Sequence, residues 1–195
     1  MALEQIPREL QARPNWHSIR QDKKPVNEGP FTFNQAVAGT VDGYNAGYHL
    51  QDKDEIICLD LDHCHGESWA EEMLDWFPGT FKERSISGDG YHVWMRGKIP
   101  KKYLVEGNSG RFGRKKPGHW LEVYEGRKIM IATGDRIEGE ELTEHSLALR
   151  MVLEEYFEPG DRPAHSPAWI RTDFPYKNPR DWRISKNRGI GFAAE

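Results

Sequence analysis

Asp60 and Asp62 lie two residues apart at the end of the apolar run 55–62, whose sequence is EIICLDLD. Because side chains alternate across a strand, both carboxylates share one face and the neighbouring leucines share the other. Two carboxylates about 7 Å apart on one face repel each other unless a cation lies between them. Mg²⁺ and Mn²⁺ take such oxygen ligands and bridge them to substrate phosphates. The run therefore predicts a divalent-metal site, with a merely solvated polar face as the alternative.

The segment 85–92, SISGDGYH, combines a glycine-rich turn with a histidine. Backbone N–H groups in such turns can approach a phosphate closely. Because His92 opens a strand beside the turn, the segment predicts a grip on a polyphosphate. An ordinary hairpin turn with a partly exposed histidine is the alternative. The candidate phosphate-binding residues are Ser85, Ser87, Gly88, Asp89, Gly90 and His92.

Glu122 lies in the strand-like run 119–124 between apolar neighbours, where an unpaired carboxylate is costly. Arg127, in the turn that follows, has a guanidinium that can bind a phosphate through two hydrogen bonds. The alternative is an ion pair of Glu122 with Arg96 or Lys128. Two aspartates, a glutamate, a histidine, a glycine-rich turn and an arginine together predict metal-assisted phosphoryl transfer.

The periodicity of apolar residues predicts the elements that must position these side chains. We expect strands at 16–19, 46–50, 55–62, 80–85 and 91–97, and a hairpin made by 119–124 and 128–133. We expect helices at 4–12, from a Thr32/Gln35 capping box to Gly39, at 67–77 and at 141–157, with a basic mobile loop at 98–118. Strands grouped centrally among helices indicate an α+β sheet domain.

Composition narrows the classes of protein. The 195 residues suffice for one domain, or one domain with a tail. A net charge of −4 excludes a nucleic-acid binder that acts through bulk positive charge. Two cysteines do not make a disulfide framework. No apolar run approaches the ~20 residues of a membrane span, and the polar N-terminus is unlike a signal peptide, so we expect a cytoplasmic protein without a membrane partner.

The three motifs, in this order and spacing, resemble the prim-pol domain of phage and plasmid replication proteins, a member of the archaeo-eukaryotic primase superfamily. The resemblance covers about 16–134. It rests on the runs 57–63, 85–92 and 121–125, on Arg127 and 133–134, and upstream on Trp16, 24–25 and 47–48.

The resemblance implies an RRM-like mixed or antiparallel sheet cradle with flanking helices. It implies that Asp60, Asp62 and Glu122 bind two Mg²⁺ or Mn²⁺ ions, and that Ser87, His92 and Arg127 hold the incoming triphosphate. Lys24 is a further candidate for phosphate or template contact. The implied activity is that of a template-directed nucleotidyltransferase, a DNA polymerase with primase activity, in a phage- or plasmid-encoded replication protein of a prokaryotic host. Its implied partners are single-stranded or primed DNA, dNTP or NTP, and a helicase module or protein.

We expect the prim-pol domain to span 1–157, with 158–195 as an irregular arm or linker. Little room remains after residue 134 for a helicase or a helical priming domain, which favours elongation over de novo priming. Two groups of basic residues are expected to contact template or primer phosphates. They are Lys98, Lys101, Lys102, Arg111, Arg114, Lys115 and Lys116, and Arg171, Lys177, Arg180, Arg183, Lys186 and Arg188.

Four alternatives remain. His63 and His65 resemble the histidine pair of rolling-circle nicking endonucleases, which attack DNA with a tyrosine. With Cys58 and Cys64 the same histidines have the residue types of a zinc site, although strand alternation separates them. The third alternative is a catalytically idle nucleic-acid-binding module. The fourth is a glycosyltransferase that uses Asp-x-Asp for a nucleotide-sugar.

Overall fold

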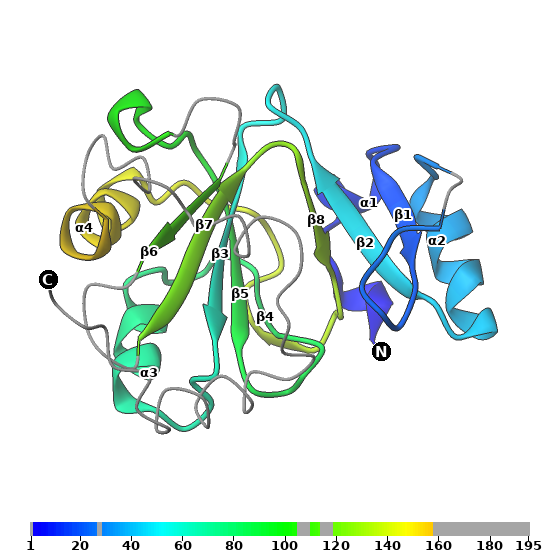
Figure 1. Cartoon of the computed structure of the whole chain (residues 1–195), viewed down its shortest axis with the longest axis horizontal. Coiled ribbons are helices and arrows are strands. Elements are labelled where there is room, and N and C mark those ends of the chain that lie inside the picture. The colour runs from blue at the N-terminus through cyan, green and yellow to red at the C-terminus, as the bar shows by residue number, and fades with distance from the viewer. Residues whose placement is uncertain (1, 27–28, 105–109, 114–118, 158–195) are drawn as a thin grey trace, which may run out of the picture. The chain divides into compact units, whose positions relative to one another are not determined.

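The computed structural model describes residues 2–26, 29–104, 110–113 and 119–157, which form an α+β domain with two antiparallel sheets (Figure 1). The larger sheet has six strands. In spatial order they are β6 (Gly110–Gly113), β7 (Trp120–Glu125), β3 (Ile56–Asp62), β5 (Tyr91–Arg96), β4 (Lys82–Arg84) and β9 (Arg136–Glu138). The smaller sheet consists of β1 (Trp16–Ile19), β2 (Asn45–Leu50) and β8 (Lys128–Ile131). Every pairing between these strands is antiparallel.

Within the described residues four α-helices accompany the sheets: α1 (Arg8–Gln11), α2 (Phe33–Gly39), α3 (Ser68–Asp75) and α4 (Ser146–Tyr156). Single 3₁₀ turns occupy Leu3–Gln5, Thr40–Asp42 and Lys101–Tyr103. The helix expected at 4–12 is divided, because Pro7 has no N–H to continue the first turn and instead precedes α1. The Thr32/Gln35 capping box of α2 is confirmed. In the described part of the chain, no helix has the length and apolar character to cross a membrane.

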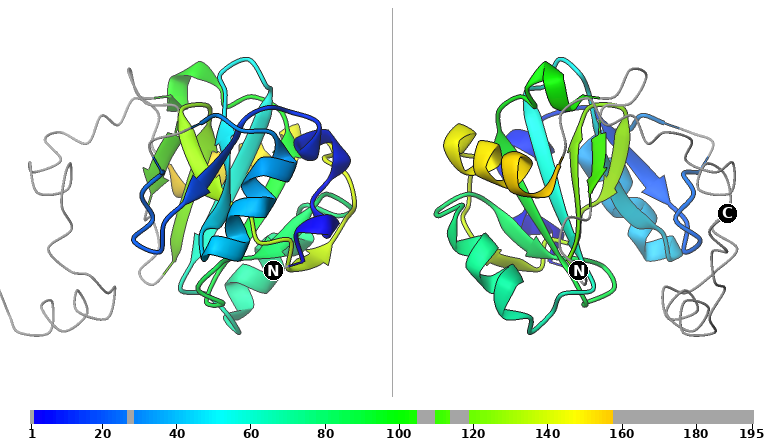
Figure 2. Two further views of the ribbon diagram at one scale, coloured as in Figure 1. Left: turned by 90° about the vertical axis from the view of Figure 1, so that its right-hand side faces the viewer. Right: turned by 60° about the vertical axis from the view of Figure 1, so that its left-hand side comes forward.

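Each face of the six-stranded sheet packs against a different layer. On one face Ile57, Leu59 and Leu61 lie in a core completed by α3 and α4. On the other face Ile56 and Cys58 lie in a second core built with the small sheet and α2. Figure 2 shows α2 against β1 and β2 in one view and α3 and α4 together in the other. The alternation expected for 55–62 is therefore correct, and both faces of β3 are buried along most of its length.

The hairpin expected from 119–124 and 128–133 is wrong. The two segments are consecutive, but β7 pairs with β3 and β6, whereas β8 pairs with β2. Because both edges of β7 are occupied, its hydrogen-bonding groups are satisfied before β8 begins. Gly126 and Arg127 have left-handed backbone angles, φ 67° and φ 50°, and turn the chain toward the small sheet.

Two further expectations change. The segment 98–118 is not wholly a loop, because a 3₁₀ turn and the edge strand β6 lie within it. Periodicity also gave no indication of β9, whose three residues are all exposed. The expected arm at 158–195 lies outside the described residues, as do 105–109 and 114–118, which contain three members of the first basic group: Arg114, Lys115 and Lys116.

Candidate functional site

Glu122, Asp60 and His92 occupy one row across three neighbouring strands. Asp60 of β3 lies opposite Glu122 of β7 on one side and opposite His92 of β5 on the other. Directly opposed residues of antiparallel strands have Cβ atoms about 4.5–5.5 Å apart and share a face. The carboxylate row and the histidine, read from three separate motifs, therefore do converge.

His92 and Asp60 form an ion pair at one side of the row, and Asp62 lies beyond Asp60 along β3. His92 Nε2 lies 3.6 Å from Asp60 Oδ1. Asp62, two residues further along β3, lies opposite Trp120 and is half-buried. The face of β3 that begins in the apolar core beside the small sheet therefore becomes polar toward its end. Three carboxylates and one imidazole lie there.

The electrostatics show that these groups interact. Burial, together with the charges of Asp62 and Glu122, raises the pKa of Asp60 from 3.8 to about 7 against the opposing charges of His92 and Lys128. For His92, burial lowers the pKa, but the hydrogen bond to Glu83 and the charge of Asp60 outweigh it, so that its pKa is raised. The site therefore carries more negative charge than its own cations balance.

A divalent cation would relieve this excess, and the donor set is suited to one. Carboxylate oxygens are the ligands that Mg²⁺ and Mn²⁺ select. Among the residues that the structure describes, no three acidic, histidine or cysteine side chains already stand together as a closed metal cluster. The residue types and the strand register are compatible with a divalent cation.

One reason that the cluster is open is the hydrogen bonding of Glu122. The Tyr124 hydroxyl donates to Glu122 Oε2 at 2.5 Å, and Lys128 Nζ donates to the Tyr124 oxygen at 3.1 Å. Neither ion pair considered for Glu122 forms: Lys128 is joined to it through Tyr124, and Arg96 pairs with Glu9 at 2.9 Å. Lys128 nevertheless acts on the site, because its charge lowers the pKa of Asp60.

The 85–90 loop lies close to the end of β3. A Cβ added to Gly90 would stand 2.2 Å from the Leu61 carbonyl oxygen, so only glycine permits this approach. The Ser85 and Ser87 hydroxyls are 3.0 Å apart, and Gly88 has a φ of +72°. The loop therefore lies beside the carboxylates, which is the position expected of a loop that binds phosphate.

A second group of candidates is not brought to the row. Arg127 Nε pairs with Asp52 Oδ2 at 3.0 Å, in the turns at the Ile56 end of β3, away from Asp62. The Lys24 side chain is 73% exposed and lies 4.0 Å from Asp22 in the segment after β1. Their phosphate-binding roles stay predictions that these positions do not support.

His63 and His65 have separate partners. His63 Nδ1 lies 2.8 Å from Asp89 Oδ2, whereas His65 Nδ1 lies 2.8 Å from the Tyr91 hydroxyl and 3.0 Å from an Arg84 nitrogen. Cys58 and Cys64 are buried in the two different cores. The four side chains therefore do not assemble into the zinc site considered above.

Sequence reasoning missed Glu83, which adjoins His92. Glu83 is fully buried, and its Oε1 lies 3.1 Å from His92 Nδ1 and accepts from Trp94 Nε1 at 3.0 Å. Its Oε2 accepts from the backbone N–H groups of Thr133 and Gly134 at 2.9 and 2.8 Å. The available signal was a lone acidic residue in the alternating run 80–85.

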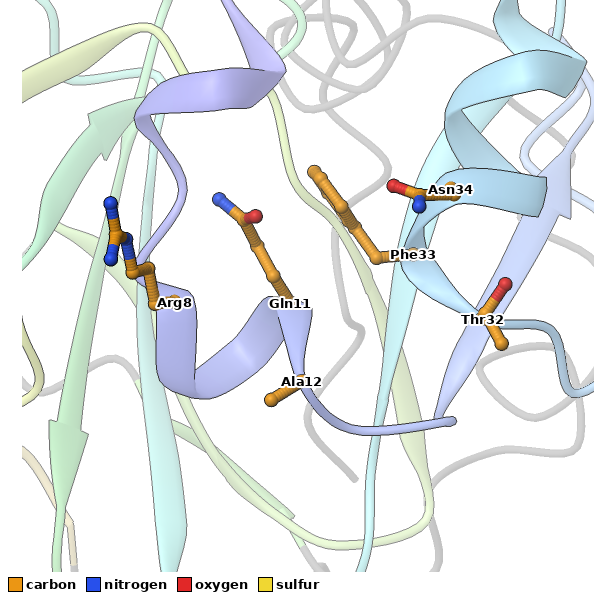
Figure 3. Close-up of a pocket in the computed structure, with 6 residues that line it drawn as sticks. All are labelled: Arg8, Gln11, Ala12, Thr32, Phe33 and Asn34. Carbon is orange, nitrogen blue, oxygen red and sulfur yellow. The ribbon is translucent and has the colours of Figure 1, made fainter.

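A pocket of about 330 Å³ lies elsewhere, between α1 and the start of α2 (Figure 3). Its lining is Arg8, Gln11, Ala12, Thr32, Phe33 and Asn34, which includes none of the candidate residues. We assign the site to the row of Glu122, Asp60 and His92, because the lining of the pocket has a single charged side chain, Arg8, and no carboxylate.

Comparison with known proteins tests the resemblance to the prim-pol family. The chain is 31% identical, over 162 residues, to a protein named DNA Primase-polymerase from Nitratiruptor phage NrS-1. The aligned region covers 77% of this chain and 21% of the phage protein, so the chain spans about a fifth of that relative's length. No family model matches. The predicted resemblance is thereby confirmed: the similarity supports a prim-pol domain in this chain.

Proposed function

We propose that the chain is a metal-dependent, template-directed nucleotidyltransferase that extends DNA, with primer synthesis as its second activity. The observation that carries the proposal is the row in which Asp60 is flanked by Glu122 and His92. The similarity to a phage primase-polymerase supports it independently. We place this activity in phage replication in a prokaryotic cytoplasm.

The strand order supports an RRM-like core of the archaeo-eukaryotic primase type. Along the chain β3, α3, β4 and β5 follow one another and β7 comes after β6, and in the sheet these four strands stand in the order β7-β3-β5-β4. This strand order matches that of the split β-α-β arrangement, in which the first strand lies centrally between the third and the fourth. Its two central strands, β3 and β5, carry Asp60 and His92, which explains why they meet.

Each residue has a defined task in the proposed reaction. Asp60, Asp62 and Glu122 would hold two Mg²⁺ or Mn²⁺ ions, which when bound lower the pKa of an attacking hydroxyl and stabilise the departing pyrophosphate. The Nε2 atom of His92 lies on the same face and, when the ring is protonated at both nitrogens, would donate to a phosphate oxygen. The 85–90 loop and Lys128 border the row from opposite sides and would orient the triphosphate.

Primer extension tests the proposal. Purified protein is incubated with a primed single-stranded DNA template, Mg²⁺ or Mn²⁺, and dNTPs or NTPs. We expect extension by the wild type and none by Asp60→Ala/Asp62→Ala, while Asp75→Ala, on the exposed side of α3, stays active. Failure of the wild type to extend, or full activity of the double variant, would refute the proposal. DNA binding without extension would instead favour the idle binding module.

Binding measurements test the task of His92 separately. We expect His92→Ala to weaken binding of a nucleotide more than binding of the DNA template. Equal losses of both would contradict a role at the triphosphate.

A further inference from the structure

Glu83 is a buried carboxylate whose hydrogen-bonding capacity is filled by donors from three segments of the chain. An ionised carboxylate accepts at about four lone-pair positions. Four N–H groups surround Glu83: those of His92 and Trp94 on Oε1, and the backbone groups of Thr133 and Gly134 on Oε2. The Thr133 hydroxyl lies 3.1 Å from Oε2 as well, and is 2.7 Å from the Arg84 carbonyl.

These donors determine how His92 is held. An indole N–H and a backbone N–H can only donate, so both oxygens of Glu83 act as acceptors. Nδ1 of His92 must then carry a proton toward Glu83. A histidine whose one nitrogen is fixed in this way presents the other nitrogen in a defined direction and tautomer.

We propose that Glu83 is a positioning residue for His92: by accepting the Nδ1 proton it fixes the imidazole ring, so that Nε2, which carries a proton when the ring is charged, faces Asp60 and the incoming triphosphate. The inference rests on the proposed function for the triphosphate. Its geometric part, the fixed ring, stands on the hydrogen bonds alone.

A purely structural role for Glu83 is the competing explanation, since the same carboxylate also joins β4, β5 and the segment at 133–134. A buried charge that only joins strands is a poor stabiliser, because its desolvation offsets most of what its hydrogen bonds contribute. In metal sites and in hydrolase triads, a carboxylate behind a histidine fixes the ring in the same way. The two explanations differ in what they predict for His92.

Glu83→Gln separates them. A glutamine amide has one oxygen, which can serve only one of the two donor pairs. Two fixed donors, the backbone N–H groups of Thr133 and Gly134, lie on one side, and one fixed donor, the Trp94 N–H, lies on the other. We therefore expect the oxygen to remain with the backbone pair and the NH₂ group to face His92. Nδ1 of His92 would then become the acceptor, and the proton would move to Nε2.

The tautomer is read by two-bond ¹H–¹⁵N correlation spectra of histidine-labelled protein at alkaline pH. The chain has 8 histidines, and His92→Gln identifies the signals of His92. We expect Nδ1–H in the wild type and a shift to Nε2–H in Glu83→Gln. Thr133→Val, which removes the hydroxyl contact and keeps the backbone N–H, is the matched control and should leave the tautomer unchanged.

Binding of dATP with Mn²⁺ gives the second readout. Loss of the partner behind a metal-ligating histidine costs about 10–100-fold. We expect a loss of this order in Glu83→Gln, because its NH₂ group cannot accept from Nδ1 and so disfavours the charged ring that donates from Nε2. We expect a loss of less than about twofold in Thr133→Val. A wild-type His92 in the Nε2–H form overturns the inference, even if Glu83→Gln does not fold. An unchanged tautomer and unchanged dATP binding in folded Glu83→Gln also overturn it. A wild type that extends no primer would instead refute the proposed function, because the tautomer measurement does not depend on catalysis.

Discussion

Replacing Asp60 by asparagine should remove a pH-dependent loss of folding stability from the metal-free protein. Burial, with repulsion from Asp62 and Glu122, raises the pKa of Asp60 from 3.8 to about 7. At about 1.4 kcal/mol for each pH unit, this change corresponds to about 4 kcal/mol. Because folding raises the pKa, the stabilisation is complete below about pH 4 and is lost as the pH rises through about 7.

His92 is part of the same titration. Its pKa is also raised, so its contribution is likewise lost as the pH rises, and the two groups titrate as a pair. We therefore expect the unfolding free energy of the metal-free wild type to fall by up to about 4 kcal/mol between about pH 4 and about pH 8. Asp60→Asn should show a much smaller fall over this range.

Urea denaturation in the presence of EDTA, at a series of pH values, measures the difference. Asp75→Asn, on the exposed side of α3, is the matched control and should follow the wild type. Added Mn²⁺ should raise the unfolding free energy of the wild type at high pH, since a ligand that binds only the folded state stabilises that state. The same addition should not raise the unfolding free energy of Asp60→Asn. Parallel curves for the wild type and Asp60→Asn would show that the carboxylates do not interact as argued.

Three further outcomes are expected. Gly90→Ala should lower the unfolding free energy by about 3 kcal/mol, because the added Cβ meets a backbone carbonyl of β3. Gly66→Ala, where φ is left-handed but the space is open, should lower it by about 1 kcal/mol. Equal losses for the two variants in urea denaturation would contradict the close approach of Gly90 to β3. Lys128→Met should raise the KM for dATP in primer extension about tenfold, which corresponds to the loss of one charge-assisted contact. Arg127→Met should change this KM less than about twofold. The opposite order would restore Arg127 as the triphosphate ligand. Leu59→Ala, fully buried in the centre of β3, should cost about 2–5 kcal/mol by the same denaturation measurement, and a loss below about 1 kcal/mol would refute its place in the core.

Local patterns were sufficient to predict the residues that line the row. Strand alternation places Asp60 and Asp62 on one face of β3, and this follows from the backbone alone. The same is true of His92 at the start of β5. The capping box of α2 was also readable, because it involves groups only three residues apart.

Local patterns failed where distant segments compete for the same partner. The 119–133 segment looks like a hairpin, yet β7 has both edges filled by β3 and β6, and its successor joins β2. This choice turns Lys128, and not Arg127, toward the carboxylates. It also brings Thr133 and Gly134 to Glu83, a residue that a sequence pattern presents only as one acidic side chain in a short strand.

The sequence by itself determined which side chains are available for the chemistry and which face of its strand each one occupies, because both depend on composition and on the two-residue repeat of extended backbone. Only the tertiary structure decided that β5 and β7 flank β3, so that His92 and Glu122 stand on either side of Asp60. Strand order arises from contacts between residues far apart in the chain, and burial of the assembled row is what changes the pKa values of its members.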